Sequence, residues 1–393
     1  MKTEIKRFAH TVLSGAALLL VIISAVTPPP VFADDFSDAC FFIKSKWENE
    51  RLYALDYFIE KDDERAVPFV LKAVGDKSAN VRLRAARALV RLGHAEDRVS
   101  VPALLDQIAA EPDIKVLEEL LYALGNFSES ESASLSLKER FKGMQREHKY
   151  DLIDALIPLI RRNRTAYLNF FDVVKSAIFS NDEVLRLHAV INLGEFGEAE
   201  YILDLLLRTL TDKNDDIREV TCKYLGVLKP HRALNPLILR GLNDASPKVR
   251  RAAVVAVKNY KNPASFDFFK NIIQFDVDGE TRGEAALALG VLGDRKAITL
   301  LKEALLDSAN VVRLNSAYAL TNYGNWDGEK VLVWFLWEQN LPAYRRRAVE
   351  GLAATRSRSV IPQLRRALSD WDDQVRDTAF YALREKWHFD ITQ

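Results

Sequence analysis

The sequence predicts an all-α fold, a superhelix or solenoid of about eleven helical hairpins. The first observation behind this prediction is a pattern of small and apolar residues that returns at steps of 31 to 35 residues along most of the chain. A period of about 20 to 50 residues is typical of stacked repeats. The second observation is that the spacing within each copy follows the turn of an α-helix, whereas no stretch alternates as a half-buried strand does.

Each repeat contains a marker helix, which begins with an apolar residue followed by arginine or a residue in its place. Small or apolar residues follow at helical spacing, and glycine often ends the helix. The clearest copy runs from Thr281 to Gly293. The step from Val116 to Leu185 is about two periods long, so one degenerate repeat is expected inside it. The apolar marker residues are Val81, Val116, Leu185, Ile217, Val249, Thr281, Val312, Tyr344 and Val375.

A second apolar helix precedes each marker helix. Neither helix can bury its apolar stripe alone, so the two are expected to pack as a hairpin against neighbouring hairpins. Proline is tolerated in the first turn of a helix, where its missing N–H would have no partner. We therefore expect prolines to open four of these preceding helices. Examples of the helices are 67–74, 202–210, 234–242, 298–306 and 360–368, and the prolines are Pro68, Pro102, Pro236 and Pro362.

In six repeats an aspartate stands six residues before an arginine. The aspartate is expected to satisfy N–H groups at the helix start. The arginine is expected to reach a carboxylate or a carbonyl of the next unit. Because the pairs recur at one spacing, we interpret them as a structural ladder and not as a catalytic row. They are Asp76 and Arg82, Asp212 and Arg218, Asp244 and Arg250, Asp276 and Arg282, Asp307 and Arg313, and Asp370 and Arg376.

The repeats resemble HEAT repeats, in particular the short type of about 30 residues known as PBS-lyase HEAT-like repeats. The Asp, Val-Arg, Ala-Ala, Ala-Leu-Gly and Leu-Gly positions of 79–93, 280–293 and 307–324 show the resemblance best, and it covers about residues 36 to 390. The resemblance implies a helical solenoid. It leaves function open, because such repeats occur in enzymes, adaptors and scaffolds. The family also includes lyases that attach chromophores to a partner protein. No residue of this sequence can be matched to a catalytic residue of those lyases.

The first 33 residues predict a signal peptide. Basic residues precede an apolar run at 12–26, and Val31 and Ala33 fit a signal-peptidase site. The apolar run is shorter than the roughly 20 residues that span a bilayer. We therefore expect cleavage near Ala33, a periplasmic or secreted mature protein, and no membrane span after cleavage. An uncleaved membrane anchor is the alternative.

The expected organisation has four parts. Residues 1–33 form the signal peptide, 34–127 form N-terminal HEAT-like repeats, and 166–393 form C-terminal HEAT-like repeats. Residues 128–165 depart from the pattern, with a serine- and glutamate-rich start and Pro158 near the end. This segment is expected to be either a degenerate hairpin or an insertion, since insertions in solenoids lie in loops on one face.

Composition argues against several classes of function. Lysine plus arginine and aspartate plus glutamate number 55 each, and nucleic-acid binders usually carry a basic excess. The two cysteines, Cys40 and Cys222, lie many repeats apart and are expected to be buried and unpaired. No histidine has a second ligand at metal-binding spacing, and no nucleophile elbow or phosphate-binding glycine loop is present. We expect a protein that is not an enzyme, without cofactor or metal.

Departures from the repeat point to a partner-binding region near the C-terminus. Tryptophans cluster there, at Trp326, Trp334, Trp337, Trp371 and Trp387. Trp334 and Trp337 are three apart and should share one helix face. We expect the cluster to fill the core between hairpins, since aromatic residues bury large areas. A partner surface is the alternative.

The other candidate surface is the groove of the solenoid, whose exposed positions are expected three and six residues after each marker. These positions mix charges with apolar residues, which favours a protein or peptide partner over a polyanion. The candidate partner-binding residues from the groove and the aromatic cluster together are Tyr318, Asn315, Trp334, Trp337, Arg347 and Tyr381.

These observations predict an exported, non-catalytic scaffold or adaptor that binds a protein partner through the groove or the C-terminal aromatic end. The alternative is a lyase-type enzyme or enzyme subunit that acts on an exported substrate. Binding of carbohydrate by exposed tryptophans is a third hypothesis.

Overall fold

The computed structural model describes residues 35–92, 97–126, 130–197, 200–337, 339–355 and 357–386. The secondary structure in these ranges is helical and contains no strand, so the predicted all-α fold is confirmed. The expected signal peptide lies outside these ranges. Within them, no helix has both the length and the apolar character that crossing a membrane requires. The chain divides into two compact units, Met1–Phe179 and Ser180–Gln393.

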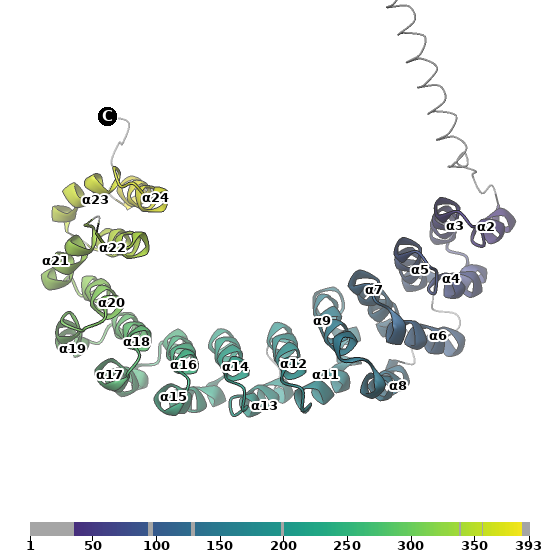
Figure 1. Ribbon diagram of the computed structural model, residues 1–393, viewed down its shortest axis with the longest axis horizontal. Coiled ribbons are helices and arrows are strands. Elements are labelled where there is room, and N and C mark those ends of the chain that lie inside the picture. The colour runs from purple at the N-terminus through teal and green to yellow at the C-terminus, as the bar shows by residue number, and fades with distance from the viewer. Residues whose placement is uncertain are drawn as a thin grey trace, which may run out of the picture. The chain divides into compact units, whose positions relative to one another are not determined.

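In the first unit, helices follow one another with short connections (Figure 1). They are α2 (Phe36–Phe42), α3 (Glu48–Lys61), α4 (Val67–Ala73), α5 (Ala79–Leu92), α6 (Asp97–Ala110), α7 (Ile114–Gly125), α8 (Ser130–Gly143), α9 (Arg146–Arg162), α10 (Arg164–Leu168) and α11 (Phe171–Ile178).

The second unit continues the same alternation of helices. Its helices are α12 (Glu183–Phe196), α13 (Glu200–Thr209), α14 (Asp215–Leu228), α15 (Leu234–Asn243), α16 (Pro247–Tyr260), α17 (Phe266–Phe275), α18 (Gly279–Leu292), α19 (Ala297–Ala304), α20 (Asn310–Thr321), α21 (Trp326–Phe335), α22 (Pro342–Ala354), α23 (Ile361–Ala367) and α24 (Asp373–Tyr381).

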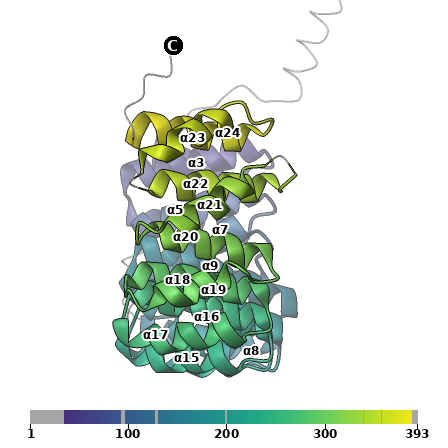
Figure 2. The ribbon, with the colours of Figure 1, turned by 90° about the vertical axis from the view of Figure 1, so that its left-hand side faces the viewer.

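Within each unit the helices pair as hairpins, and we call the first helix of a hairpin its A helix and the second its B helix. Each B helix packs on its own A helix and on the B helices of the neighbouring hairpins, as α16 does with α15, α14 and α18. Figure 2 shows the hairpins of the second unit stacked one above another. Each hairpin therefore buries its apolar stripes against its neighbours, as a solenoid requires.

Residues 128–165, for which a degenerate hairpin and an insertion were both open, contain α8 and α9. α8 packs against α6 and α11, and α9 packs against α7 and α10, so the two helices take the A and B positions after α7. Pro158 lies inside α9. Proline removes one helical hydrogen bond at such a position, yet the helix runs four residues beyond it, to Arg162.

Two glycines of the marker helix α18 show why small residues recur there. A Cβ atom at Gly290 would lie 2.7 Å from the Cβ of Ala319 in α20, so only glycine lets the two B helices approach this closely. Gly293 ends α18 with a φ of 72°, a left-handed conformation that other residues adopt at a cost. These positions stabilise the stack.

The aspartate and arginine positions form a ladder between neighbouring repeats. Arg250 in α16 donates two hydrogen bonds to the carboxylate of Asp276 in the next repeat, over 2.8 and 2.9 Å. It also donates to the carbonyl of Asp244, six residues before it, over 3.0 Å. Asp276 in turn accepts from the N–H of Asp278 at the start of α18. Each rung thus ties one turn to the next with charge-assisted hydrogen bonds.

The same rung recurs in both units and confirms the predicted ladder for Arg82, Arg218, Arg250 and Arg282. For Arg313 and Arg376 the prediction is wrong, because their hydrogen bonds go to Asp307 and Asn310, and to Asp370 and Asp373, within their own repeats. The arginine meets the carboxylate of the following repeat, and the carbonyl that it binds belongs to its own repeat. The rungs are Arg51 with Asp76, Arg82 with Glu111, Arg186 with Asp212, Arg218 with Asp244, Arg250 with Asp276, Arg282 with Asp307, and Arg345 with Asp370.

Two other expectations differ from the structure in detail. Pro68 and Pro362 do lie in the first turn of their helices, but Pro102 lies inside α6, which begins five residues earlier. Cys222 is buried, whereas Cys40 is only half-buried. Both are free thiols.

Candidate functional site

The candidate partner-binding residues fall into two groups in the second unit. Tyr318, Arg347 and Tyr381 belong to the B helices α20, α22 and α24, whereas Trp334 lies on the A helix α21 and Trp337 follows the end of that helix. Asn315 also belongs to α20. The structure brings Arg347 and Tyr318 together, but it does not join all six residues into one site.

In the B-helix group, Arg347 connects two neighbouring repeats. Its guanidinium carbon lies 4.2 Å from the centre of the Tyr318 ring, and its Nη1 lies 3.0 Å from a carboxylate oxygen of Glu350. A Cβ atom at Gly351 would lie 3.0 Å from the Tyr318 ring, so the ring packs closely against α22. Tyr318 and Arg347 are half-buried, and Tyr381 is exposed.

Asn315 was expected at the exposed face of the groove, and this expectation is wrong. Its side chain is 7% exposed. Its amide nitrogen would lie 3.1 Å from a Cβ atom at Gly283 of α18. The position three residues after this marker therefore faces the preceding B helix, and Asn315 fills space that the glycine leaves. A partner cannot contact a side chain in this place.

The tryptophan cluster was expected to fill the core, and the described members do not. Trp326, Trp334, Trp337 and Trp371 are 54%, 44%, 48% and 64% exposed. Trp387 lies outside the described residues. The core at α21 is instead filled by smaller residues and one aromatic residue, among them Leu332, Phe335, Leu352 and Leu364. The tryptophans therefore have no place left in the interior.

Trp334 lies in the last turn of α21, and Trp337 lies two residues beyond the end of the helix at Phe335. Trp334 packs on the edge of the Phe335 ring, with the ring centres 4.9 Å apart. Trp337 is held in the turn that follows, where its N–H donates to the carbonyl of Trp334 over 3.2 Å. Both indoles lie on the surface, Trp334 on the helix and Trp337 on the turn that follows it.

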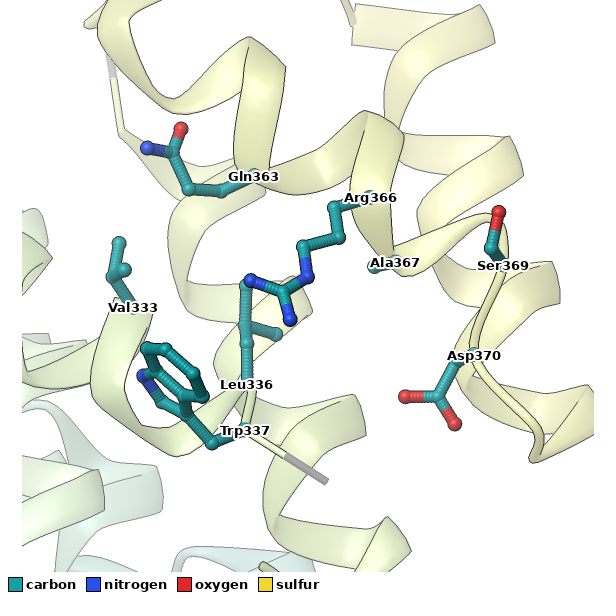
Figure 3. A pocket seen from close by; sticks show the side chains of 8 residues that line it. All are labelled: Val333, Leu336, Trp337, Gln363, Arg366, Ala367, Ser369 and Asp370. Carbon is teal, nitrogen blue, oxygen red and sulfur yellow. The ribbon is translucent and has the colours of Figure 1, made fainter. Parts of the chain in front are cut away.

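A cavity of about 150 Å³ lies beside Trp337, between α21 and α23 (Figure 3). Val333 and Trp337 form one wall, and Gln363 and Arg366 of α23 form the other. The Arg366 side chain extends toward Trp337, and its guanidinium carbon lies 5.2 Å from the indole centre. The cavity thus combines an aromatic surface with a cation.

Asp370 also lines this cavity, but its charge is already matched. It accepts hydrogen bonds from Nε and Nη2 of the buried Arg345 over 2.8 and 2.7 Å. Burial alone raises the pKa of Asp370, but the hydrogen bonds from Arg345 and from the N–H of Asp372 outweigh it, so the pKa lies below its usual value. Asp370 is therefore a structural anion beside the cavity.

A second cavity, of about 270 Å³, continues between the same two helices. It shares Val333 and Gln363 with the first and extends to Trp326, Glu329 and Val360. Glu329 is 7% exposed, and its Oε2 has no hydrogen-bond partner among the described residues. Burial raises the pKa of Glu329, and the Ser359 hydroxyl lowers it in part.

Comparisons with known proteins agree with this architecture. The family model of HEAT repeats matches residues 43–125, 236–321 and 307–384, which together make up more than half of the chain. The chain belongs to the HEAT-repeat family. A comparison with curated proteins found no match.

Solved structures that this HEAT-repeat chain resembles include nuclear transport proteins. The Kap95p chain crystallised with RanGDP has a TM-score of 0.60 and 12% identity, over 91% of this chain and 57% of that one. Yeast importin-β, also Kap95p, has a TM-score of 0.57 and 13% identity, over 91% and 58%. A Kap121p variant has 0.57 and 13%, over 92% and 46%. At this identity the likeness concerns the fold. This chain spans little more than half the length of Kap95p.

Glu329, Gln363 and Arg366 were not among the candidates from the sequence. Glu329 carried a detectable signal, because it lies three residues before Leu332 and so shares the apolar face of α21. A charged residue on the buried face of a HEAT helix is uncommon. Arg366 belongs to an arginine-rich segment that resembles a solvated helix face, and only the packing of α21 against α23 places it over Trp337.

Two observations on the described residues bear on catalysis. No group of three or more histidine, cysteine, aspartate or glutamate residues in these ranges could hold a metal ion. Burial raises the pKa of the Cys222 thiol to about 12, so this thiol stays protonated at neutral pH and is a poor nucleophile. The arrangement around α21 and α23 is suited to binding.

Proposed function

We propose that this HEAT-repeat protein is exported and works as a non-catalytic scaffold or adaptor, which binds a protein or peptide partner at its last repeats. The exposed surface of α21 to α24 is the main contact region in this proposal. The B-helix residues Tyr318, Arg347 and Tyr381 are a second contact region.

The observation that carries the proposal is the exposure of four tryptophans between residues 326 and 371. Tryptophan and arginine are enriched at the energetic centres of protein interfaces. A large apolar side chain on the surface costs free energy in water and gains it back when a partner covers it. The concentration of such side chains on one set of hairpins favours a docking surface over a solvated face.

The fold supports the same proposal. Stacked hairpins form extended surfaces that many repeat proteins use for binding. Kap95p, which has a similar fold, has been crystallised with RanGDP and with Nup1. Because the identity is 12%, this chain is not expected to bind the same molecules.

Export rests on the residues before position 34. The basic start, the apolar run at 12–26 and the small residues before Asp34 fit a cleaved signal peptide. N-terminal sequencing of the mature protein from the periplasm or the culture medium tests this part of the proposal. A chain that retains Met1, or that stays in the cytoplasm, would overturn it. The short PBS-lyase HEAT-like type, supported by the 31- and 32-residue steps from Leu185 onward, is likewise a proposal.

The partner is tested by cross-linking in intact cells, followed by affinity capture of the mature protein. We expect a specific protein to be enriched by the natural chain and lost from the double variant Trp334→Ala and Trp337→Ala. Phe275→Ala, which removes an exposed aromatic residue from another repeat, is the matched control and should leave capture unchanged. Equal capture by all three proteins would count against the α21 surface.

The alternative, a lyase-type enzyme or enzyme subunit acting on an exported substrate, needs convergent polar groups in one pocket. The cavities between α21 and α23 are the place where such a substrate would bind. The same captured partner decides between the two functions: a partner that leaves with a covalent change favours the enzyme, and an unchanged one favours the scaffold.

A further inference from the structure

The two cavities between α21 and α23 form one groove with an unusual buried acid at one end. Val333 and Gln363 line both cavities, so a bound segment can pass from one to the other. Glu329 lies at one end, and Arg366 with Trp337 lies at the other. Both walls belong to the second unit.

Glu329 differs from the other buried carboxylates of the described residues. Glu111 is paired with Arg82, Glu119 with Arg87 and Arg162, and Asp244 with Arg218. Glu329 has no ion-pair partner in these ranges, and its Oε2 is buried without a hydrogen bond. An unsatisfied buried acceptor costs about 1–3 kcal/mol, and more when it is charged. Because the Glu329 carboxylate lies in a cavity wall, a bound ligand could donate the hydrogen bond that Oε2 lacks.

The walls around Glu329 indicate which donor fits. Trp326 is exposed and lines the same cavity, so its ring is available to a cation. Val333 and Val360 supply an apolar lining that suits a methylene chain. The unsatisfied atom is a single oxygen, which suits a point donor such as an ammonium better than the two-pronged fork of a guanidinium.

Lys330 also lines the cavity beside Glu329, so that end of the groove holds groups of both signs, whereas the opposite end carries a cation. Arg366 lies over the Trp337 ring and has no ion pair with any residue that the structure describes. Asp370 beside it is fully engaged by Arg345. This end therefore presents an unmatched cation, which is complementary to a carboxylate.

We propose that this groove binds an extended peptide segment of a partner protein, with a lysine side chain inserted beside Glu329 and Trp326 and an acidic residue against Arg366. This inference deepens the scaffold function proposed above and rests on it. The lysine ammonium donates to Oε2 of Glu329, and its methylene chain packs on Val333 and Val360. The positions of Glu329 and Arg366 at opposite ends of the groove determine the direction in which the peptide segment lies.

The experiment uses the mature full-length protein, immobilised, and four libraries of acetylated and amidated octapeptides. The libraries are random except for one fixed central residue, which is lysine, norleucine, arginine or acetyl-lysine. We expect retention of the lysine library at least about tenfold above the norleucine library, which corresponds to 1.4 kcal/mol. Acidic residues should be enriched at positions on one side of the fixed lysine.

Three variants identify the groups responsible. Glu329→Gln keeps the shape of the side chain and should abolish the preference for lysine over norleucine. Arg366→Ala should keep that preference and lose the enrichment of acidic residues. Trp326→Ala removes an exposed ring that the core does not need and should reduce retention of the lysine library. Arg365→Ala, the exposed neighbour of Arg366, is the control and should behave as the natural protein.

The outcomes separate this inference from the scaffold function. Equal retention of the lysine and norleucine libraries, preference for arginine, or an unchanged preference in Glu329→Gln would each overturn the lysine site. No retention of any library would overturn it as well. In all these cases cellular capture of a partner that depends on Trp334 and Trp337 would still support the scaffold function.

Discussion

Carboxylates buried in two regions of the second unit have different surroundings. In the hairpins from α13 to α20, the turn aspartates at Asp212, Asp244, Asp276 and Asp307 each accept two hydrogen bonds from an arginine of the preceding repeat. In α21, Glu329 is buried without an ion-pair partner among the described residues, and Trp326 and Trp334 of the same helix are exposed. Positions of the repeat pattern stabilise the array, whereas departures from the pattern leave a polar group unsatisfied and aromatic side chains exposed.

Removing one rung of the ladder should cause the largest loss of stability. Arg250→Ala leaves Asp276, whose side chain is 4% exposed, buried without its bidentate partner. Breaking a buried pair in this way costs about 3–5 kcal/mol. Urea unfolding followed by circular dichroism measures the loss.

The neighbouring Arg251 provides the control for this rung. It is exposed, and its pair with Glu280 is 4.0 Å long, so Arg251→Ala should cost about 0.5 kcal/mol or less. Similar losses in the two variants would show that the ladder contributes no more than an ordinary surface pair.

Filling a close contact between two B helices of the regular repeats should give the next largest effect. Gly290→Val places side-chain atoms where even a Cβ atom would lie 2.7 Å from Ala319, and overpacking of this kind costs about 1–3 kcal/mol. Gly143→Ala, where a Cβ atom would meet nothing within 4 Å, should be nearly neutral. Thermal melting of both variants tests the difference, which a similar melting temperature would contradict.

Lowering the pH should change the stability contributed by the two regions in opposite directions. The pKa of Asp244 and that of Asp307 lie below the usual value, because the hydrogen bonds from Arg218 and Arg282 and from backbone N–H groups outweigh burial. Their stabilising contribution is therefore present above the usual aspartate pKa of about 4 and is lost as pH falls below it. The pKa of Glu329 is raised by burial, so its contribution is lost as pH rises above about 4.3.

The variant Glu329→Gln separates these two effects. It should raise the free energy of unfolding at pH 7 by about 1 kcal/mol or less and leave it almost unchanged at pH 3. Melting temperatures between pH 3 and pH 7 measure both. A variant that loses stability at pH 7 would mean that the carboxylate has a partner in the folded protein.

The smallest effect on stability is expected at the tryptophans of the α21 surface. Trp337→Ala removes a side chain that is half exposed and lies outside the core, so the change should be within about 0.5 kcal/mol. The adjacent core residue gives the contrast, since Phe335→Ala should cost about 3–5 kcal/mol. If Trp337→Ala also destabilised by several kcal/mol, its indole would belong to the core of the repeat.

The regular part of the fold could be predicted from the sequence because one physical constraint is repeated many times. The spacing of the marker residues predicts the B helices, and the aspartate and arginine positions predict the ladder, since every copy must fit against the next. Even α8 and α9, whose sequence departs from the pattern, take the A and B positions after α7. Stacking imposes the same geometry on a degenerate copy.

The candidate site was harder to predict because it depends on single positions. Leu332 and Phe335 fill the core under α21, whereas Trp334 and Trp337 are exposed. The spacing of the repeats does not predict how densely a core is packed. Asn315 is buried because Gly283 leaves room for it, a contact between two helices 32 residues apart. Arg366 meets Trp337 through the packing of two A helices. Such contacts follow from three-dimensional detail that recurs nowhere else in the chain.

The rungs of the ladder are chemically interchangeable, which bears on how a chain of this kind can change its length. In each rung the arginine meets the carboxylate of the next repeat, so a rung is not specific for one particular neighbour. Removing residues 218–249 would join Ile217 directly to Arg250 and preserve the apolar–arginine order at the seam. Arg186 would still reach Asp212, and Arg250 would still reach Asp276. Duplication or loss of whole repeats can thus change the length of the array while the ion pairs between the remaining repeats are kept. The residues around α21 that depart from the pattern are not affected by such a change.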